Sequence, residues 1–527
     1  MDTTQHTNEI EQNYDDNPYY SFSYEQSAPE HLAAVAHVFG LSAPDVSKAR
    51  VLELGCAAGR NLIPFAVRNP GARAIGVDLS SAQVKEGRQN IKRLKLKNVE
   101  LRQQDLTTLG AVDGKFDYII CHGVYSWVPQ AVQQAILRVC SENLSADGIA
   151  YLGYKTYPGW KSREIVRDAM LLRAGGLKGA GERLAHGRGM LDFLREHARK
   201  DSVLARAVEQ DHEMVNNSDA GFSAYVNHDY LASSNAPCYF QDFAKRIDEH
   251  GLAYLADANL PSMFASNYGD EIGRLLLAEC GHSQVLTEQY LDFVSDRAFR
   301  TSLIVHKERD GGIQYRVEHE RLRKLHLAAS LKCADDDVRM DDSPQRFDAE
   351  NGNSIILNHA IDKTAAIELE RVWPFTMSFD ELKRNVRTRL GNDAALPDSD
   401  IEARLDVFFN AMVVRGLGRF RLHPLTRSSG NAHLHAAVRN YPAGLPRGQM
   451  AHTFNPWHQP VQMDAVTQLL LPHIDGSRNE TDLLGILSKA VKEGALTVSR
   501  PAGENDEAGE RIVLARELER ALKRLCA

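Results

Sequence analysis

The sequence predicts an α/β protein with a doubly wound parallel sheet, followed by small modules of helices and short strands. Between residues 51 and 154, apolar strand-like segments alternate with amphipathic helical patterns, which is the order of a sheet covered by helices on both faces. A glycine turn, Gly55 to Gly59, joins the first strand to the first helix. In the last third of the chain, helices are followed by short strands, a pattern typical of winged-helix-like modules.

The first elements follow one another in regular order. Ser80 or Ser81 supplies an N-cap for one helix, and Pro129 suits the first turn of another. The expected strands are 51–54, 73–77, 98–102, 116–121 and 148–154, and the expected helices are 59–68, 80–95 and 129–144.

After residue 160 this alternation stops, and residues 160–238 carry amphipathic helical patterns instead. Strand-like segments return at 252–256 and 301–306. We therefore interpret residues 160–238 and 259–298 as insertions in one domain that covers residues 1–308.

The rest of the chain is divided by a polar, acidic segment at residues 334–353. Its composition predicts a linker, which we place at 309–355. The winged-helix-like modules then cover 356–440 and 441–527. Neither carries a helix with clustered Lys and Arg, so a protein-binding or structural role is favoured over binding of nucleic acid.

Composition narrows the class of protein. The chain has 527 residues and a net charge of −8, which argues against a dominant phosphate-binding surface. Its seven cysteines are scattered, without a C-x-x-C pair, as expected in a reducing compartment. The polar, acidic N-terminus is unlike a signal peptide, and no apolar run is long enough to span a bilayer. The sequence therefore predicts a cytoplasmic protein without membrane insertion.

Three carboxylates accompany the strands around the glycine turn. Glu53 precedes Gly55, Asp78 ends the second strand and Asp105 follows the third. The G-x-x-x-G spacing of the turn differs from the dinucleotide-binding G-x-G-x-x-G. One such feature alone would fit an ordinary strand–helix connection, but the three carboxylates in order resemble class I S-adenosylmethionine-dependent methyltransferases, which have a Rossmann-like sheet.

The resemblance implies roles for these residues. In that family the turn passes under the methionine part of the cofactor, the second acid holds the ribose hydroxyls and the third holds the adenine amino group. The family's sheet ends in a sixth strand and an antiparallel seventh. The cofactor-binding residues expected from S-adenosylmethionine are Glu53, Gly55, Cys56, Gly59, Asp78, Leu79, Asp105, Leu106, His122 and Gly123.

Aromatic residues follow the fourth and fifth strands, where this fold presents the methyl acceptor. The N-P-P-Y type motif of enzymes acting on planar nitrogens is absent, and no set of metal ligands is evident, so no metal is expected. Aromatic faces suit a cation, and a dry aromatic tunnel lowers the pKa of a lysine. The candidate catalytic residues are Tyr125, Trp127 and His122, and the candidate substrate channel consists of Tyr154, Tyr157 and Trp160. The alternative is that these aromatic residues fill the core beneath the insertion.

A closer resemblance rests on longer stretches of sequence. VLELGCAAGRNLIP, CHGVYSWVP, YPGW, NHDYLASSNAPCYF and QYLDFVSDRAFRTSLIVH resemble methyltransferases with a methyltransferase regulatory domain, including bacterial enzymes that methylate lysines of outer-membrane proteins. The resemblance implies a protein substrate, an outer-membrane or surface protein, and a homodimer formed through the insertion 160–238. Ala58 and Arg60 stand where the family has serine and glycine, and His228-Asp229-Tyr230 replaces His-Glu-Tyr.

The leading hypothesis is thus a protein-lysine N-methyltransferase. A small-molecule O- or N-methyltransferase stays open, because an aromatic pocket serves it equally well. A regulatory protein that binds the cofactor without turnover is the third hypothesis. The intact Glu53, Gly55, Gly59, Asp78 and Asp105 argue against the third.

Overall fold

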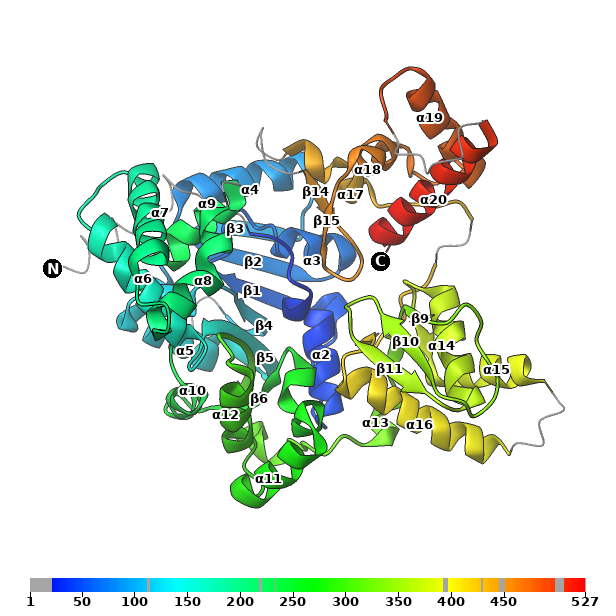
Figure 1. The fold of residues 1–527 in the computed structure, drawn as a ribbon, viewed down its shortest axis with the longest axis horizontal. Helices are drawn as coiled ribbons and strands as arrows, with labels where there is room; N and C mark the ends of the chain where they lie inside the picture. The colour runs from blue at the N-terminus through cyan, green and yellow to red at the C-terminus, as the bar shows by residue number, and fades with distance from the viewer. Residues whose placement is uncertain are drawn as a thin grey trace. The chain divides into compact units, whose positions relative to one another are not determined.

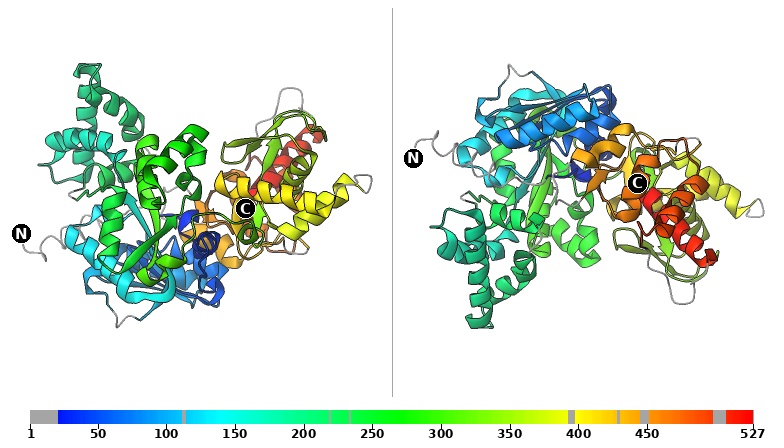
Figure 2. Two further views of the ribbon diagram at one scale, coloured as in Figure 1. Left: turned by 90° about the horizontal axis from the view of Figure 1, so that it is seen from below. Right: turned by 90° about the horizontal axis from the view of Figure 1, so that it is seen from above.

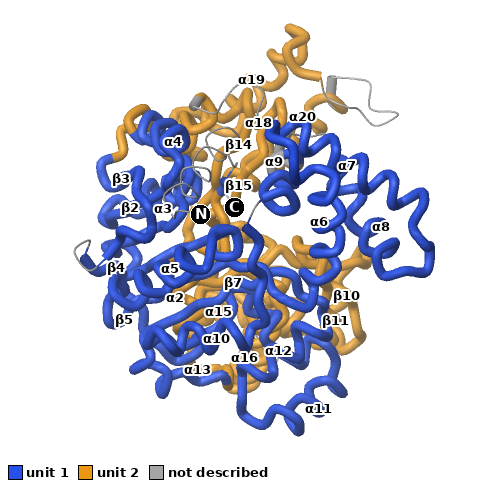
Figure 3. The backbone as a smooth tube through the Cα atoms, turned by 90° about the vertical axis from the view of Figure 1, so that its left-hand side faces the viewer, with its two compact units in different colours: residues 1–22, 39–91, 97–315 blue, residues 23–38, 92–96, 316–527 orange. Residues whose placement is uncertain are grey.

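The computed structural model describes residues 21–110, 114–217, 220–232, 234–391, 397–427, 430–444, 451–497 and 507–526. The chain forms two compact units (Figure 3). Unit 1 contains the described residues up to 22, together with 39–91 and 97–315, and unit 2 contains 23–38, 92–96 and 316–527.

Unit 1 is built on a mostly parallel sheet (Figure 1). In the described part of the chain its seven strands have the order β3-β2-β1-β4-β5-β7-β6, and β7 is antiparallel to both neighbours. This confirms the predicted fold class. The strands are β1 (Arg50–Leu54), β2 (Arg73–Asp78), β3 (Val99–Gln103), β4 (Phe116–Cys121), β5 (Leu144–Lys155), β6 (Leu252–Asp257) and β7 (Phe299–His306).

The strand order reverses between β1 and β4, and in open α/β sheets the carboxyl ends of strands at such a point border the ligand crevice. The central strands are buried along nearly their whole length because helices cover both faces. Ser80 caps α4 as predicted, since its Oγ accepts a hydrogen bond from the Gln83 N–H at 3.3 Å. The connecting helices are α3 (Leu62–Arg68), α4 (Ser81–Leu94), α5 (Gln130–Asn143) and α10 (Phe240–Asp248).

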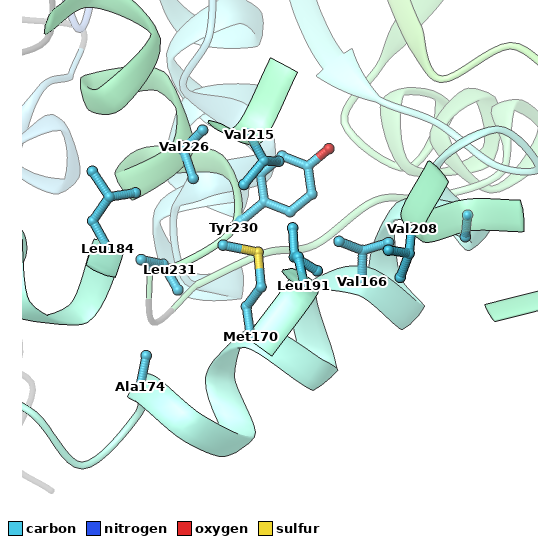
Figure 4. Packing of buried hydrophobic residues seen from close by; sticks show 11 residues of the cluster. Val166, Met170, Ala174, Leu184, Leu191, Val208, Val215, Val226, Tyr230 and Leu231 are labelled. Carbon is cyan, nitrogen blue, oxygen red and sulfur yellow. The ribbon is translucent and has the colours of Figure 1, made fainter. Parts of the chain in front are cut away.

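The insertion after β5 is helical, as its amphipathic pattern predicts. It consists of α6 (Trp160–Ala174), α7 (Ala180–His197), α8 (Val203–Asn216) and α9 (Ala220–Asp229). These helices have a buried core of their own, in which Met170, Leu191 and Tyr230 lie together (Figure 4). Both views of Figure 2 show the blue-green helices of this insertion projecting from the sheet of unit 1. The insertion is therefore a lobe with its own packing.

The second insertion lies between β6 and β7 and contains η6 (Leu260–Met263), η7 (Ala265–Tyr268), α11 (Asp270–Cys280) and α12 (Gln284–Ser295). A buried ion network attaches α12 to β7. The Arg300 guanidinium donates to Asp292 Oδ2 at 2.8 Å and to Glu288 Oε2 at 3.0 Å, and all three side chains are buried. The network fixes the start of β7, where Phe299 lies.

In unit 2 the structure differs from the expected linker. The described residues of 309–355 include α13 (His319–Leu322), β8 (His326–Ala328), β9 (Leu331–Cys333) and β10 (Gln345–Ala349). The first part of the acidic segment, residues 334–344, is the loop between the antiparallel strands β9 and β10. Buried Lys363 holds this loop, because its Nζ donates to the carbonyls of Arg339 and Ser343, each at 2.7 Å. The polar composition thus belongs to a long surface loop that the buried Lys363 side chain holds in place.

The middle part of unit 2 contains two small sheets, with orders β11-β10-β9 and β12-β8-β13 in the described residues. Helices η1 (Glu25–Ser27) and α2 (Pro29–Val38) also belong to unit 2. The remaining elements are β11 (Ser354–Leu357), α14 (Ala360–Val372), β12 (Met377–Ser378), α15 (Phe379–Leu390), α16 (Asp398–Val414) and β13 (Arg419–Arg421).

The C-terminal part of unit 2 ends in α20 (Glu507–Cys526), whose buried Leu514, Leu518 and Leu525 form its apolar face. Leu496-Thr497-Val498 has the pattern of the short strand that should end the second winged-helix-like module, but Leu496 and Thr497 form no strand and residue 498 lies outside the described residues. The hairpin β14 (His452–Phe454) and β15 (Pro460–Gln462) instead precedes α18 (Ala465–Leu470) and α19 (Glu480–Lys492), and α17 (Ala436–Asn440) precedes that hairpin. None of the helices in the described ranges is long and apolar enough to cross a membrane.

Candidate active site

The glycine turn lies between β1 and α3 and depends on both of its glycines. Gly55 and Gly59 have φ values of +73° and +71°, which favour glycine. A Cβ on Gly55 would lie 2.3 Å from Cγ2 of Val124, so the turn packs directly on the loop after β4. Ala57 has a φ of +48°, and its N–H donates to Asp78 Oδ2 at 2.7 Å. The carboxylate that ends β2 therefore also holds the turn.

Glu53 and Asn61 form a buried pair beneath the turn. The Asn61 amide donates to Glu53 Oε1 at 2.9 Å, whereas Oε2 is buried without a hydrogen-bond partner among the described residues. Burial raises the pKa of Glu53 to about 8. A buried carboxylate oxygen without a donor costs free energy, and a cationic ligand group would satisfy it.

The two other acids end β2 and follow β3. Asp78 accepts hydrogen bonds from the backbone N–H groups of Ala57 and Ser80, at 2.7 and 2.9 Å. Asp105 accepts from the N–H and hydroxyl of Thr107 through Oδ1, at 2.8 and 2.9 Å. Both carboxylates are half-buried, so they are held in place but still accessible.

The other expected cofactor residues lie at the same carboxyl edge of the sheet. Leu79 and Leu106 are half-buried and flank the two acids in sequence, whereas Cys56 is buried and packs beside Gly76. A Cβ on Gly123 would meet nothing within 4 Å. At the carboxyl ends of the first four strands, partly exposed apolar and polar side chains therefore lie beside one another.

Arg60 departs from the family pattern without filling the turn. Its side chain is buried, and Nη2 forms an ion pair with Glu86 Oε1 of α4 at 2.8 Å. The guanidinium is thus held by α4.

His122 follows β4 and packs on β5 and β7. Its Nδ1 lies 2.8 Å from the Tyr151 hydroxyl, and its ring stacks on Tyr151 and meets the ring of Phe299 edge-on. Burial lowers the pKa of His122 to about 4, so the imidazole is neutral at physiological pH. A Cβ on Gly153 would lie 3.1 Å from Nδ1, so a glycine here makes room for the ring.

Three of the predicted aromatic residues are buried: Trp160 packs against Tyr230 of the insertion core, and Tyr125 and Tyr154 lie beneath α10. Tyr125 is fully buried and meets Tyr154 and Phe243 edge-on. Tyr154 is also fully buried, stacks on Phe243 at 4.1 Å and has its hydroxyl 3.0 Å from Ser302 Oγ. This placement favours core filling between β5 and α10 as the role of both tyrosines.

Trp127 and Trp160 both lie close to Lys155, a residue to which the sequence patterns assigned no role. The Lys155 ammonium is 4.3 Å from the ring centroid of Trp127 and 4.0 Å from that of Trp160. It also forms an ion pair with Asp229 Oδ1 at 3.1 Å. Tyr157 lies apart from this group, and its hydroxyl donates to Glu164 Oε1 at 2.6 Å.

The sequence patterns assigned no role in the site to five residues that the structure places there: Asn61, Tyr151, Lys155, Asp229 and Phe299. Lys155 follows the largely apolar run 149–154 of β5, and that charge was the available signal. Asp229 comes from α9 of the insertion, and nothing in the local sequence connects it to Lys155.

Three family models match the chain. Residues 45–165 match a methyltransferase domain, residues 223–306 a predicted methyltransferase regulatory domain, and residues 443–527 the C-terminal winged helix domain of PKMT.

Sequence relatives and a solved structure were also found. The uncharacterised protein RP789 of Rickettsia prowazekii is 32% identical over 517 residues, which cover 95% of this chain and 89% of that protein. A second protein of that organism, RP028, is 34% identical over 46% of this chain and 96% of its own length. The solved structure of PKMT2 from Rickettsia typhi in complex with AdoHcy matches with a TM-score of 0.83 and 25% identity, over 96% of this chain and 98% of that one. The chain therefore belongs to the S-adenosylmethionine-dependent methyltransferases that carry a methyltransferase regulatory domain, and S-adenosylmethionine is its cofactor.

Proposed function

We propose that this methyltransferase modifies the side-chain amine of lysine residues in a protein substrate. The observation that carries the proposal is the aromatic surface beyond β4 and β5, formed by half-buried His122 and Trp127 and by Phe299, which is 37% exposed. Such rings attract an alkylammonium and exclude water from it. The likeness to PKMT2 over 96% of the chain, together with the PKMT winged helix model, supports a protein acceptor.

The turn and the three acids have the chemistry to hold the cofactor. The unpartnered Oε2 of Glu53 suits the cationic amino group of its methionine part. Asp78 would accept the ribose hydroxyls, since backbone N–H groups hold both of its oxygens in place at the end of β2 and a carboxylate can accept several hydrogen bonds. Asp105 Oδ2 would accept from the adenine amino group, between the half-buried Leu79 and Leu106.

The cofactor supplies a methyl group on a sulfonium, and the protein has to align a neutral amine with it. Alignment of this kind contributes much of the rate of a displacement reaction. The neutral His122 places no positive charge against an approaching lysine. Trp127 and Phe299 would guide its alkyl chain and keep water away, which also favours loss of the amine proton.

The partners are part of the proposal. Exposed apolar side chains on the helical insertion, Leu172 at 82%, Phe193 at 52% and Val203 at 58%, favour a homodimer through residues 160–238. An outer-membrane or surface protein is the proposed substrate, by the family resemblance. The six cysteines whose side chains the structure describes are unpaired, which fits modification in the reducing cytoplasm.

Methyl-labelled S-adenosylmethionine tests the proposal. The full-length protein is incubated with an outer-membrane protein fraction and, separately, with a low-molecular-mass extract. We expect label in protein and methyllysines after hydrolysis, and no label with Asp78→Asn as the matched control. Label confined to small molecules would establish the small-molecule alternative, and no transfer to either fraction would contradict both.

A further inference from the structure

A buried ion pair lies directly behind the proposed acceptor surface. Lys155 is the last residue of β5 and is 1% exposed, and Asp229 is the last residue of α9 and is also buried. The Lys155 Nζ is 3.1 Å from Asp229 Oδ1 and donates to Asn235 Oδ1 at 2.9 Å. The pair therefore joins the sheet to the helical insertion.

Asp229 holds Trp127 as well. The indole Nε1–H of Trp127 donates to the same Oδ1 atom at 2.7 Å, while the Lys155 ammonium lies 4.3 Å from the centroid of its ring. The carboxylate fixes the edge of the indole and the ammonium lies against its face. With both contacts in place, Trp127 has little freedom to rotate about its side-chain bonds.

The chain around Asp229 is bonded to the same loop. The Ala236 N–H donates to the Ser126 carbonyl at 2.8 Å, and Ser126 Oγ accepts from the Lys155 N–H at 2.9 Å. The Cys238 N–H then donates to the Lys155 carbonyl at 3.3 Å. Residues 229–238 are thus attached both to the loop after β4 and to the end of β5.

The pair lies on the face of β5 that carries the acceptor surface. Side chains of a strand alternate between faces, so Tyr151, Gly153 and Lys155 share one face. Tyr151 and Gly153 lie against His122, and Lys155 is paired in register with Phe299 of β7. Lys155 is therefore the next side chain beyond the surface on which the amine would be aligned.

We propose that Lys155 and Asp229 are positioning residues, whose buried ion pair holds the Trp127 indole at the acceptor end of the site and makes methyl transfer depend on the helical insertion. The inference rests on the proposed function in one respect, namely that Trp127 contacts the acceptor. Both residues are buried behind Trp127, so their proposed action is through the indole and not by contact with the cofactor or the reacting amine. Stability alone does not require a buried ion pair, because apolar side chains of similar size often stabilise a protein equally well.

The test uses a double variant of the full chain, because removal of one partner would leave an uncompensated buried charge. Lys155→Met with Asp229→Leu replaces both charges by apolar side chains. We expect the variant to fold, to bind S-adenosylmethionine within about twofold of the wild-type affinity and to lose about tenfold in kcat. Trp127→Phe, which keeps a ring but lacks the indole N–H, should lose a similar factor, and adding it to the double variant should cost little more.

Two outcomes would overturn the inference. A double variant with wild-type kcat and only a changed Tm would show that the pair is purely structural. If the losses of kcat caused by Trp127→Phe and by the double variant were fully additive in free energy, the pair would not act through Trp127. The proposed function is tested separately, because the wild-type protein either labels protein lysines or does not, whereas kcat is compared on whichever acceptor the wild type uses.

If the double variant does not fold, Lys155→Met with Asp229→Asn takes its place. The amide oxygen still accepts from the indole, but the charge is lost. We then expect an intermediate loss of kcat with an unchanged KM for the cofactor. A kcat equal to that of the wild type would contradict the inference.

Discussion

The Asn61 amide donates to Glu53 at 2.9 Å beneath the glycine turn, and the second oxygen of that carboxylate has no donor in the described part of the chain. The pair leaves one buried acceptor beneath the turn at which S-adenosylmethionine is proposed to bind. Its protonation should therefore be linked both to stability and to the cofactor.

Glu53→Gln should raise the stability of the cofactor-free protein near pH 8 and change little below pH 4. Burial raises the folded pKa of Glu53 to about 8 from 4.5, so between these values the folded state binds a proton that the unfolded state has lost. The Glu53 contribution to stability therefore declines as pH rises through that window. Thermal unfolding of the wild type and of Glu53→Gln across this pH range checks the prediction. The same pH dependence of stability in the two proteins would contradict it.

Asp78→Asn should weaken cofactor binding by about tenfold or more, because the proposed role of the carboxylate is to accept charge-assisted hydrogen bonds from the ribose hydroxyls. Asp78→Ala should lose as much affinity and also loosen the turn, since Asp78 accepts from the N–H of Ala57. Calorimetric titration with S-adenosylmethionine measures both. Wild-type affinity in Asp78→Asn would remove the carboxylate from the ribose site.

The sheet and its glycine turn could be predicted because their signals are local. Each strand is a short apolar run, and the glycine pair occurs within a few residues of Glu53. The strands β9 and β10 escaped prediction because they are short and joined by an acidic loop whose anchor, Lys363, comes later in the chain.

The acceptor end could be predicted only in part. Aromatic residues in CHGVYSWVP and GYKTYPGW indicated the right region, but burial of Tyr125 and Tyr154 against Phe243 is a tertiary property. Lys155 and Asp229 are 74 residues apart in sequence and meet only when the insertion folds. Sequence patterns find strands and turns more readily than such pairs.

Turnover should fall above about pH 8 in the wild-type protein, if Lys155 must be charged to hold Asp229 and Trp127. Burial lowers the pKa of Lys155 to about 8, with smaller contributions in the same direction from Arg167 and Arg163 of α6, although Asp229 opposes them. Above that pH the amine is neutral and the pair is broken. The pH profile of kcat measures the effect, and the Lys155→Met, Asp229→Leu double variant should lack this descending limb. A limb that persists in the double variant belongs to another group.

Leu172→Glu with Phe193→Glu should convert a homodimer to monomers, because both apolar side chains are exposed on the insertion and away from its own core. Sedimentation at micromolar concentration of the wild type and the variant measures the change. Leu277→Glu, on exposed surface of α11, is the matched control and should leave the assembly unchanged. A wild-type protein that sediments as a monomer would contradict the proposed interface.

Trp127 and Tyr125 should differ in their effect on the reaction, although they are neighbours in one short helix. Trp127 is half-buried at the acceptor end, so Trp127→Ala should bind cofactor almost normally and lose about tenfold in turnover, or about 1.4 kcal/mol of transition-state stabilisation. Tyr125 is fully buried among aromatic rings, so Tyr125→Phe keeps the packing and should leave turnover within about twofold of wild type. Single-turnover rates at saturating cofactor compare the two. A large loss of turnover in Tyr125→Phe would indicate that the Tyr125 hydroxyl acts at the acceptor site. A Trp127→Ala protein that unfolds or no longer binds cofactor would indicate that Trp127 is a core residue.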